Sequence, residues 1–480
     1  MTIFVVTLTE ILFTSSALCL AADFLAKKVG IYRQYLVGLI ASLGVMISLV
    51  TMLSNWKDYL GRSMISQPVS SPFSSLYISN NFTLFVIFLV LVISFTVSIY
   101  STFWLRSDSN VGPFYALLLL LTCSLVGVAS AGDFLTLFLF WEGMSLSSYG
   151  LVSFRKSFDI TLEASLKYFF IVGLGSLIAL FGISLMYSLV GSLELDSLKN
   201  LPLGDPIAIL GLTMTFLGFG AEAALAPLHT WLPDVYSAAS TPVAAMISGA
   251  VTGMGVFGPI KILQPIISSD ASGVPVNFKL LLAIIGLATM LIGNLGGLYQ
   301  TNLRRMLGYS TIAQTGYFVS ALSTFSLLGL VAAVFAIWNH GILKSNFFAL
   351  TGSVEEGYEG GELNRLRGAG RKNKGLGVLF VLSSLGMMGS PPFGLFWSEI
   401  LIVESLVMAG GLFIALGAAV AFNMVISIGY YYRVINTVVF EEPQNEVSTL
   451  KLRQLSASVA LLTISLIAGI LPQLFLNLIT

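Results

Sequence analysis

Long apolar runs separated by short polar connectors fill this chain and decide what it can fold into. A transmembrane helix needs about 20 mostly apolar residues in a row. Only 10% of the residues are charged, against about 25% in ordinary soluble domains, and the mean hydropathy is +0.91. We therefore predict an all-α polytopic membrane protein with about fourteen transmembrane helices, near residues 3–25, 34–54, 78–102, 111–130, 133–153, 165–190, 207–226, 242–263, 279–300, 308–325, 329–350, 376–403, 406–438 and 455–478.

The connectors and their charges predict one membrane domain and its orientation. The longest connectors, at 54–77, 191–206, 351–375 and 439–454, hold no soluble domain, so residues 1–480 are expected to form a single membrane domain. Cytoplasmic loops of membrane proteins carry an excess of Lys and Arg. Odd-numbered connectors hold sixteen of these residues and even-numbered connectors hold three. Both termini are therefore expected on the non-cytoplasmic side.

The seventh run is interrupted by proline. It carries Glu222 and meets Pro227, and an irregular segment with His229, Pro233 and Asp234 is expected to follow. Proline lacks the N–H that a helix needs and clashes with the preceding turn. A broken helix at membrane depth is tolerated only against protein or a water-filled cavity. We therefore expect this span to lose helical hydrogen bonding at 226–228.

The twelfth run repeats this pattern five runs later. Glycine and proline interrupt it at 389–394, and Glu399 follows. Pairs of broken helices in corresponding positions mark inverted repeats in many transporters, with binding sites near the breaks. We therefore predict two inverted five-helix repeats, at 110–265 and 279–440, with broken helices 7 and 12.

Ionisable side chains inside the apolar runs are the candidates for function. Each charge at the centre of a bilayer costs at least ~2.5–3.5 kcal/mol on insertion scales. Such groups must face the protein interior, pair with one another or lie near water. The candidate proton-translocation residues are Glu142, Lys167, Glu222, His229, Lys261, His340, Lys344 and Glu399. Apart from His229 and Lys261, we expect all of them to face the interior.

Some of these residues also have a simpler structural explanation. His229 could cap or orient the broken helix, Lys261 could anchor the end of its run, and His340 could hydrogen-bond across helices. Asp133 and Asp234 are expected to cap helices or lie in loops. Glu10 and Glu404 have no motif around them and are expected to serve partner contacts or helix pairing. Arg304 and Arg305 are expected to enforce orientation.

Five stretches together resemble one family of membrane proteins. They read GDFLTLFLFWEGMSLSSY at 132–149, AEAALAPLHTWLPD at 221–234, QTNLRRMLGYSTIAQ at 300–314, WNHGILK at 338–344 and PPFGLFWSE at 391–399. They resemble the antiporter-like membrane subunits of respiratory complex I. That family also includes subunits of Mrp-type cation/proton antiporters, membrane-bound hydrogenases and methanogen dehydrogenases. The resemblance covers roughly 110–440.

The resemblance implies a fold and a mechanism. The fold is fourteen helices with two inverted five-helix repeats, and the mechanism is proton translocation through acids, lysines, histidines and waters at mid-membrane. By resemblance, Glu142 matches the fifth-span glutamate, Lys344 the lysine of the second half, and His340 its neighbour. Glu399 matches the twelfth-span position, where relatives have lysine or glutamate. Lys167 is similar to a sixth-span lysine found in part of the family.

One position departs from the family pattern. Relatives have a lysine five residues before the proline at 227, and that lysine pairs with the fifth-span glutamate, whereas this chain has Glu222 there. An eighth-span position that holds lysine in some members is Thr252. Two neighbouring carboxylates cannot both ionise cheaply, so Glu142 and Glu222 could share a proton or help to bind a cation. This half of the channel could instead be inactive. We expect Lys167 to be the basic residue nearest to either acid.

The predicted function is that of a proton-translocating, antiporter-like subunit of a redox-driven respiratory membrane complex. The complex could be complex I-like, quinone- or methanophenazine-reducing, or of the hydrogenase type. The chain would be a non-catalytic subunit of an NADH:quinone oxidoreductase-like translocase in the plasma membrane of a prokaryote. Two alternatives stay open: a subunit of an Mrp-type cation/proton antiporter, and a structural subunit that has lost pumping.

The chain carries no cofactor or metal motif, and its two cysteines, Cys19 and Cys123, lack metal-ligand spacing. We therefore expect the redox cofactors in partner subunits. The expected partners are the other membrane subunits of a complex, the lipid bilayer, and protons or sodium ions. No nucleic acid is expected.

Overall fold

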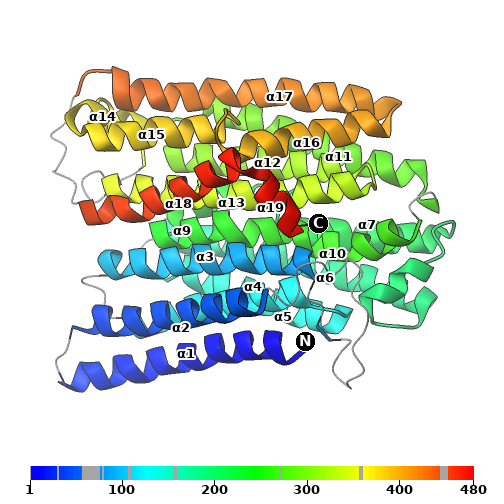
Figure 1. Ribbon diagram of the computed structural model, residues 1–480, viewed down its shortest axis with the longest axis horizontal. Coiled ribbons are helices and arrows are strands. Elements are labelled where there is room, and N and C mark those ends of the chain that lie inside the picture. The colour runs from blue at the N-terminus through cyan, green and yellow to red at the C-terminus, as the bar shows by residue number, and fades with distance from the viewer. Residues whose placement is uncertain are drawn as a thin grey trace. The chain divides into compact units, whose positions relative to one another are not determined.

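The computed structural model describes residues 2–29, 32–56, 76–77, 80–105, 110–154, 159–270, 273–355, 361–443 and 452–479. Over these ranges the chain forms nineteen α-helices, with isolated β-bridges and no β-strand (Figure 1). The predicted all-α fold is confirmed. The chain divides into two compact units. Unit 1 is Met1–Gly218, Phe257–Ser269 and Leu478–Thr480, and unit 2 is Phe219–Val256 and Asp270–Asn477.

Unit 1 consists mainly of long helices that coincide with the first predicted apolar runs. They are α1 (Thr2–Val29), α2 (Arg33–Trp56), α3 (Asn81–Trp104), α4 (Val111–Ser130), α5 (Phe134–Val152), α6 (Asp159–Val190), most of α7 (Pro206–Gly220) and the later part of α10 (Thr252–Asp270), with a 3-10 helix at Leu195–Asn200. α1 packs against α2 and α4, and α2 packs against α3 (Figure 1).

Unit 2 holds the remaining helices around α13 (Leu327–Glu355). The others are α8 (Trp231–Ala238), α9 (Thr241–Met246), the π-helix η2 (Ile247–Val251), the start of α10, α11 (Val276–Tyr299), α12 (Leu303–Leu322), the 3-10 helix η4 (Leu363–Leu366), α14 (Ala369–Lys372), α15 (Lys374–Met387), α16 (Gly394–Ala409), α17 (Leu412–Ile435), the π-helix η5 (Asn436–Phe440), α18 (Leu452–Ile470) and most of α19 (Pro472–Ile479). α13 packs against α9, α12, α15, α16 and α18, so it forms the centre of the unit.

α11 and α12 approach each other closely because glycines line their contact. A Cβ atom on Gly293 would lie 2.7 Å from the Cα of Ala313, and one on Gly316 would lie 2.5 Å from the backbone nitrogen of Met290. Any larger residue would push the two backbones apart. Small residues allow such close helix packing inside membranes. The position of α12 is thereby fixed against α11.

The apolar helices fit a membrane protein, and the last span is bent. Within the described residues, nine helices are long and apolar enough to cross a membrane, and α18 and α19 form a further pair bent by 87°. The sequence predicts a span at 455–478, and the structure adds a bend within it, because Pro472 has no N–H to continue the helix. The total of fourteen spans stays a prediction.

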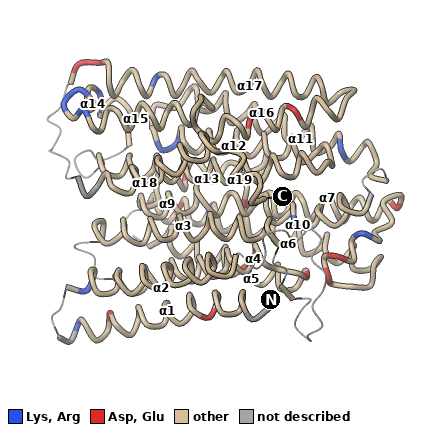
Figure 2. Tube along the Cα trace, viewed as in Figure 1, with Lys and Arg blue, Asp and Glu red and all other residues tan. Residues whose placement is uncertain are grey.

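Many of the charged residues in each unit lie close to helix ends (Figure 2). Water and lipid headgroups solvate charges there, whereas the hydrocarbon core does not. The acids and lysines within the helices are therefore exceptions that need a structural or functional reason.

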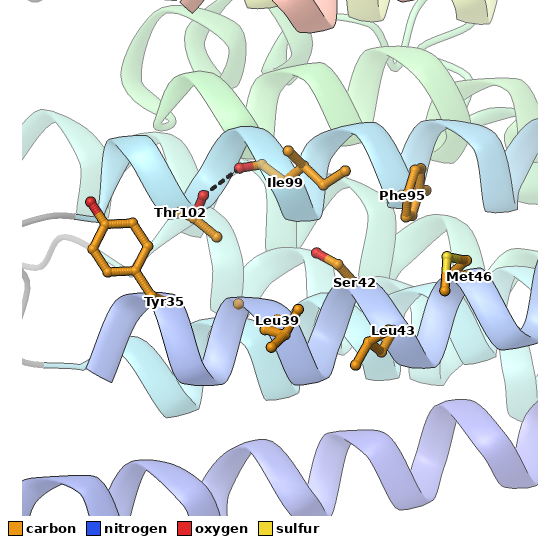
Figure 3. Close-up of a pocket in the computed structure, with 9 residues that line it drawn as sticks. Tyr35, Leu39, Ser42, Leu43, Met46, Phe95, Ile99 and Thr102 are labelled. Carbon is orange, nitrogen blue, oxygen red and sulfur yellow. Dashed lines mark hydrogen bonds between the residues drawn. The ribbon is translucent and has the colours of Figure 1, made fainter. Parts of the chain in front are cut away.

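An apolar groove of about 320 Å³ lies between α2 and α3 of unit 1 (Figure 3). Its lining includes Tyr35, Leu39, Ser42, Met46, Ile99 and Thr102. The Thr102 hydroxyl donates to the Ile99 carbonyl at 2.7 Å, so it is satisfied within its own helix. The groove contains none of the candidate proton-translocation residues, and we do not assign it to the site.

Candidate functional site

Glu142 lies near the middle of α5 in unit 1. Asp133 fixes the start of this helix, because its carboxylate accepts hydrogen bonds from the Thr136 N–H at 2.8 Å and the Thr136 hydroxyl at 2.7 Å. The cap role expected for Asp133 is confirmed. The Glu142 side chain is half-buried, and its Oε1 atom is enclosed without a hydrogen-bond partner among the described residues. This oxygen can accept a proton or a hydrogen bond.

Lys261 of α10 is buried in the same unit. Its Nζ donates to the carbonyl oxygen of Ala129 at 2.7 Å, in the last turn of α4. Carbonyls in the last turn have no partner within the helix, and a cation there interacts favourably with the helix dipole. One turn earlier on α10, a Cβ on Gly258 would lie 2.6 Å from the Trp141 ring. α10 therefore packs directly against α5 beside Glu142.

Lys167 does not lie where the sequence predicts. Its side chain is 46% exposed and pairs with Glu163 at 2.8 Å on the surface of α6. Residues four apart share one helix face, so both members of this pair point away from the interior of unit 1. The expectation that Lys167 faces the interior is wrong.

The seventh span is broken in unit 2, and the break begins earlier than expected. Helical structure is absent over 221–230, whereas the sequence predicts the break at 226–228. The physical cause includes Ala224, whose φ of +54° is a left-handed conformation incompatible with a continuing helix. Glu222 therefore lies in a turn and not in the helix, and it is fully buried. His229 is half-buried at the far end of the same turn.

Neighbouring groups satisfy the exposed backbone of this break. The Trp231 indole N–H donates to the Ala221 carbonyl at 3.0 Å, and the Ala226 N–H donates to the Thr289 hydroxyl at 3.1 Å. A Cβ on Gly255 would lie 2.7 Å from the Cα of Ala223, so the backbone of α10 runs against the turn. The irregular segment is thus held by protein on several sides, as a non-helical segment at membrane depth requires.

Two arginines of α12 hold the helix that follows the break. Arg305 forms an ion pair with Asp234 at 2.6 Å. The buried Arg304 donates to the Ala239 carbonyl at 2.8 Å and to the Thr241 hydroxyl at 2.5 Å. The sequence predicts only an orientation role for these arginines, so it misses this contact. It also places Pro233 and Asp234 in an irregular segment, whereas both lie in the first turn of α8.

Lys344 and His340 lie one turn apart on α13, in the middle of unit 2. Lys344 has no exposed surface, and its Nζ donates to the Leu307 carbonyl at 2.8 Å and the Tyr431 hydroxyl at 3.3 Å. His340 is 2% exposed. Neither of its ring nitrogens has a hydrogen-bond partner among the described residues, and its ring meets Phe318 edge-on at 5.8 Å.

The twelfth span is broken at the predicted place. α15 ends at Met387 and α16 begins at Gly394, and Gly389 between them has a φ of +68°. A Cβ on Gly389 would overlap the carboxylate of Glu399, which therefore packs directly against the break. The Oε1 atom of Glu399 accepts a hydrogen bond from Gln314 of α12 at 3.3 Å. Both broken spans contain a cis peptide bond before proline, at 227 and 392.

Comparison with known proteins shows the family. Residues 131–427 match the model described as NADH:quinone oxidoreductase/Mrp antiporter, TM. The NADH-quinone oxidoreductase subunit N of Halorhodospira halophila is 32% identical over 365 residues, which cover 75% of this chain and 74% of that protein.

Two solved structures have a similar fold. A chain of the membrane-bound sulfane sulfur reductase, an archaeal respiratory membrane complex, has a TM-score of 0.85 at 25% identity, covering 98% of this chain and 96% of that chain. A chain of respiratory complex I from Thermus thermophilus has a TM-score of 0.78 at 26% identity, covering 97% and 98%. The family match includes both broken spans and more than half of the sequence. The chain therefore belongs to the NADH:quinone oxidoreductase/Mrp antiporter transmembrane family.

Proposed function

We propose that this chain is an antiporter-like subunit that translocates protons as part of a redox-driven respiratory membrane complex. The observation that carries the proposal is Lys344, a fully buried lysine held among α12, α13 and α17 of unit 2. Within the described part of the chain it forms no ion pair. Burying a charge without a counter-ion is costly, and intramembrane ionisable groups mark proton relays and ion pathways.

His340 and Glu399 give Lys344 partners for proton exchange. The His340 ring can bind a proton on one nitrogen and release one from the other. The Glu399 carboxylate can take a proton at the oxygen that now accepts from Gln314. All three groups lie inside unit 2 on helices that pack together, α13 and α16. We therefore assign them to the second half of the pathway.

The first half would use Glu142 and Glu222, with Lys261 as its buried cation. Lys261 lies in the same unit as Glu142 and is 5% exposed, whereas Lys167 is on the surface. Burial favours Lys261 because a relay must be shielded from lipid. His229, in the same turn as Glu222, would orient that turn or take part in proton transfer.

The wider setting follows from the relatives. The relative from Halorhodospira halophila is named as a subunit of an NADH-quinone oxidoreductase. Its name favours a redox-driven complex for this chain over a gradient-driven Mrp-type exchanger. We infer that the redox cofactors reside in partner subunits and that the complex lies in the plasma membrane of a prokaryote. We also propose the two inverted repeats at 110–265 and 279–440, with both termini on the non-cytoplasmic side.

Replacing Glu142 with glutamine should reduce proton translocation several-fold while the complex still assembles. Glutamine keeps the size of the side chain and removes its proton-binding carboxylate. Translocation would be measured in inside-out vesicles with the complete complex, as acidification per electron pair transferred. A matched Glu222→Gln variant should have a similar effect if the two acids share a proton, and a smaller one if Glu222 is a silent replacement.

Normal pumping in both variants would end the idea that this half conducts protons. Sodium-dependent transport in vesicles without an electron donor would instead support an Mrp-type exchanger. If the wild-type complex and both variants transfer electrons but pump no protons, the result would support the alternative that this chain is a structural subunit.

Glu10 offers a test of partner contacts. It is exposed on α1, next to Phe13, which is 60% exposed. An exposed acid at membrane depth is costly unless another subunit covers it with a cation or a hydrogen-bond donor. Replacing Glu10 with lysine should therefore lower the amount of this chain that co-purifies with its complex. The exposed Glu194 lies outside the long helices, and Glu194→Lys should have no such effect; equal retention of the two variants would refute the contact.

A further inference from the structure

The apolar groove between α2 and α3 of unit 1 has the length of one bilayer leaflet (Figure 3). Its α2 wall runs from Tyr35, in the first turn of the helix, to Met46, which is about 16 Å at the rise of an α-helix. The hydrocarbon core of a bilayer is about 30 Å thick. The groove therefore follows a single leaflet from the end of α2 towards the bilayer midplane.

The width of the groove selects a thin occupant. Its volume of 320 Å³, spread over that length, corresponds to a cross-section of about 20 Å². An α-helix with its side chains is about 10–12 Å across, which is a cross-section of about 80 Å² or more. The groove therefore does not admit a helix of a partner subunit. An extended hydrocarbon chain is thin enough, and the acyl chains of lipids reach this surface from the bilayer.

The polar side chains along the groove already have partners. Besides Tyr35 at its end, the polar lining residues are Ser42 and Thr102. The Thr102 hydroxyl donates to the Ile99 carbonyl at 2.7 Å, and the Ser42 and Ser98 hydroxyls share a hydrogen bond of 3.2 Å. A polar solute would gain little from these groups. The lining therefore favours an apolar occupant.

The apolar side chains of the groove remain open to the surroundings. Leu39, Met46 and Ile99 are between 38% and 56% exposed. Behind them the two helices touch, because a Cβ on Gly38 would lie 2.2 Å from a side-chain carbon of Thr102. A chain in the groove gains dispersion contacts from both helices, whereas a lipid on a single helix face gains them from one.

Aromatic residues gather where the groove begins. The Tyr35 ring meets the Tyr32 ring edge-on, with centroids 6.2 Å apart. Trp104, the last residue of α3, is partly exposed at the corresponding end of that helix. Tyrosine and tryptophan are enriched at the level of the lipid headgroups. The half-exposed Tyr35 hydroxyl can therefore donate a hydrogen bond to a headgroup oxygen.

The same end of unit 1 also carries a basic side chain. Arg33, at the start of α2, binds both carboxylate oxygens of Asp23 of α1, at 2.7 and 2.8 Å, so these two charges neutralise each other. Lys27 is exposed one helical turn after Asp23 on α1. Lysines close to the membrane surface attract anionic headgroups.

We propose that the groove between α2 and α3 is a phospholipid-binding site. One acyl chain lies between the two helices from Tyr35 to Met46, and the headgroup phosphate accepts a hydrogen bond from the Tyr35 hydroxyl on the side where Lys27 is exposed. Such a lipid exchanges more slowly than the lipids on the single helix faces of unit 1. The site does not depend on whether the chain translocates protons.

The test uses the complete complex in vesicles of phosphatidylethanolamine and phosphatidylglycerol, with a trace of phosphatidylglycerol that carries a diazirine in the middle of one acyl chain. The complex is solubilised in mild detergent and washed, so that rapidly exchanging lipid is removed before illumination. Peptide mass spectrometry then locates the crosslinks. We expect them at residues that line the groove, such as Leu43, and not at Leu177, which is 65% exposed on α6.

A tryptophan in the groove should displace the chain. Leu43→Trp places an indole between the walls, and Val50→Trp is the control, because Val50 is 59% exposed on the same helix but does not line the groove. Loss of contact with two methylene groups already weakens binding about tenfold. We therefore expect Leu43→Trp to reduce the crosslinks in the groove at least about tenfold, and Val50→Trp to leave them unchanged.

Tyr35→Phe tests the headgroup contact without filling the groove, and so remains informative if Leu43→Trp lowers the unfolding midpoint. Loss of one hydrogen bond should reduce the retained lipid about threefold to tenfold, with the crosslinks at the same residues. Tyr32→Phe is the control, because Tyr32 does not line the groove, and it should retain lipid like the wild type.

Three results would overturn the proposal. Equal crosslinking at Leu177 and in the groove would show only exchanging lipid. Equal crosslinking of the groove in Leu43→Trp and in the wild type would show that the chain does not lie between the walls. A groove without crosslinks in the complete complex would show that another subunit covers it. Equal retention by Tyr35→Phe and Tyr32→Phe would refute the headgroup contact.

Discussion

Replacing Lys344 with methionine should reduce proton translocation at least about tenfold, the largest loss that we expect from any single side chain. Methionine has nearly the same length and fills the same space among α12, α13 and α17. It removes the one group in this position that can carry a proton, together with its hydrogen bonds to the Leu307 carbonyl and the Tyr431 hydroxyl. Proton uptake per electron pair in vesicles would measure the loss.

Lys199→Met provides the control. Lys199 is exposed and pairs with Asp196 in the 3-10 helix after α6, so its removal should leave pumping unchanged. Equal pumping by the Lys344 variant and this control would show that the buried lysine does not carry protons. Loss of the assembled complex in the Lys344 variant is not expected, because a neutral side chain is easier to bury than an ammonium group.

Gly389→Ala should both destabilise unit 2 and lower pumping. The residue has a φ of +68°, and an L-residue held there costs roughly 1–3 kcal/mol. The new Cβ would also overlap the Glu399 carboxylate, so this side chain must leave its place beside Gln314. We expect a lower unfolding midpoint of the purified complex and a several-fold loss of protons translocated per electron pair.

Gly410→Ala separates the two effects. Gly410 has a similar φ of +72°, but no atom lies within 4 Å of the Cβ position. It should therefore lower stability through backbone strain alone and leave pumping intact. If the two alanine variants pump equally well, the contact between Gly389 and Glu399 has no role in proton transfer.

Most of the helical framework could be predicted from the sequence, because apolar length alone defines a span. The breaks were harder to place. Proline predicts the interruption of the seventh span, but its start depends on the left-handed conformation of Ala224, which alanine rarely adopts and no local pattern signals. The 87° bend before Pro472 cannot be predicted from the sequence either, because an apolar run with one proline is compatible with a kinked span or with two helices.

The candidate site could be predicted as a set of residues but not as an arrangement. Lys167 and Lys261 look alike in sequence, since each is a lone lysine in an apolar run. Their environments differ. Lys167 forms an ion pair with Glu163 on the outward face of α6, whereas Lys261 donates a hydrogen bond to a carbonyl in the last turn of α4. The hydroxyls near Lys344 lie 34 to 87 positions away along the chain, at Ser310 and Tyr431. Only tertiary packing brings them together.

The two arginines at the start of α12 have a mechanical consequence. Arg304 and Arg305 bind the helix that follows the Glu222 turn. About one turn further along α12, the Leu307 carbonyl accepts a hydrogen bond from Lys344. α12 therefore contacts both the helix that follows the Glu222 turn and the buried lysine. We expect a shift of α12, caused by loss of the proton from Lys344 and of its hydrogen bond to that carbonyl, to reach the Glu222 turn through α8. Such a shared helix would couple the two sites without a proton passing directly between them.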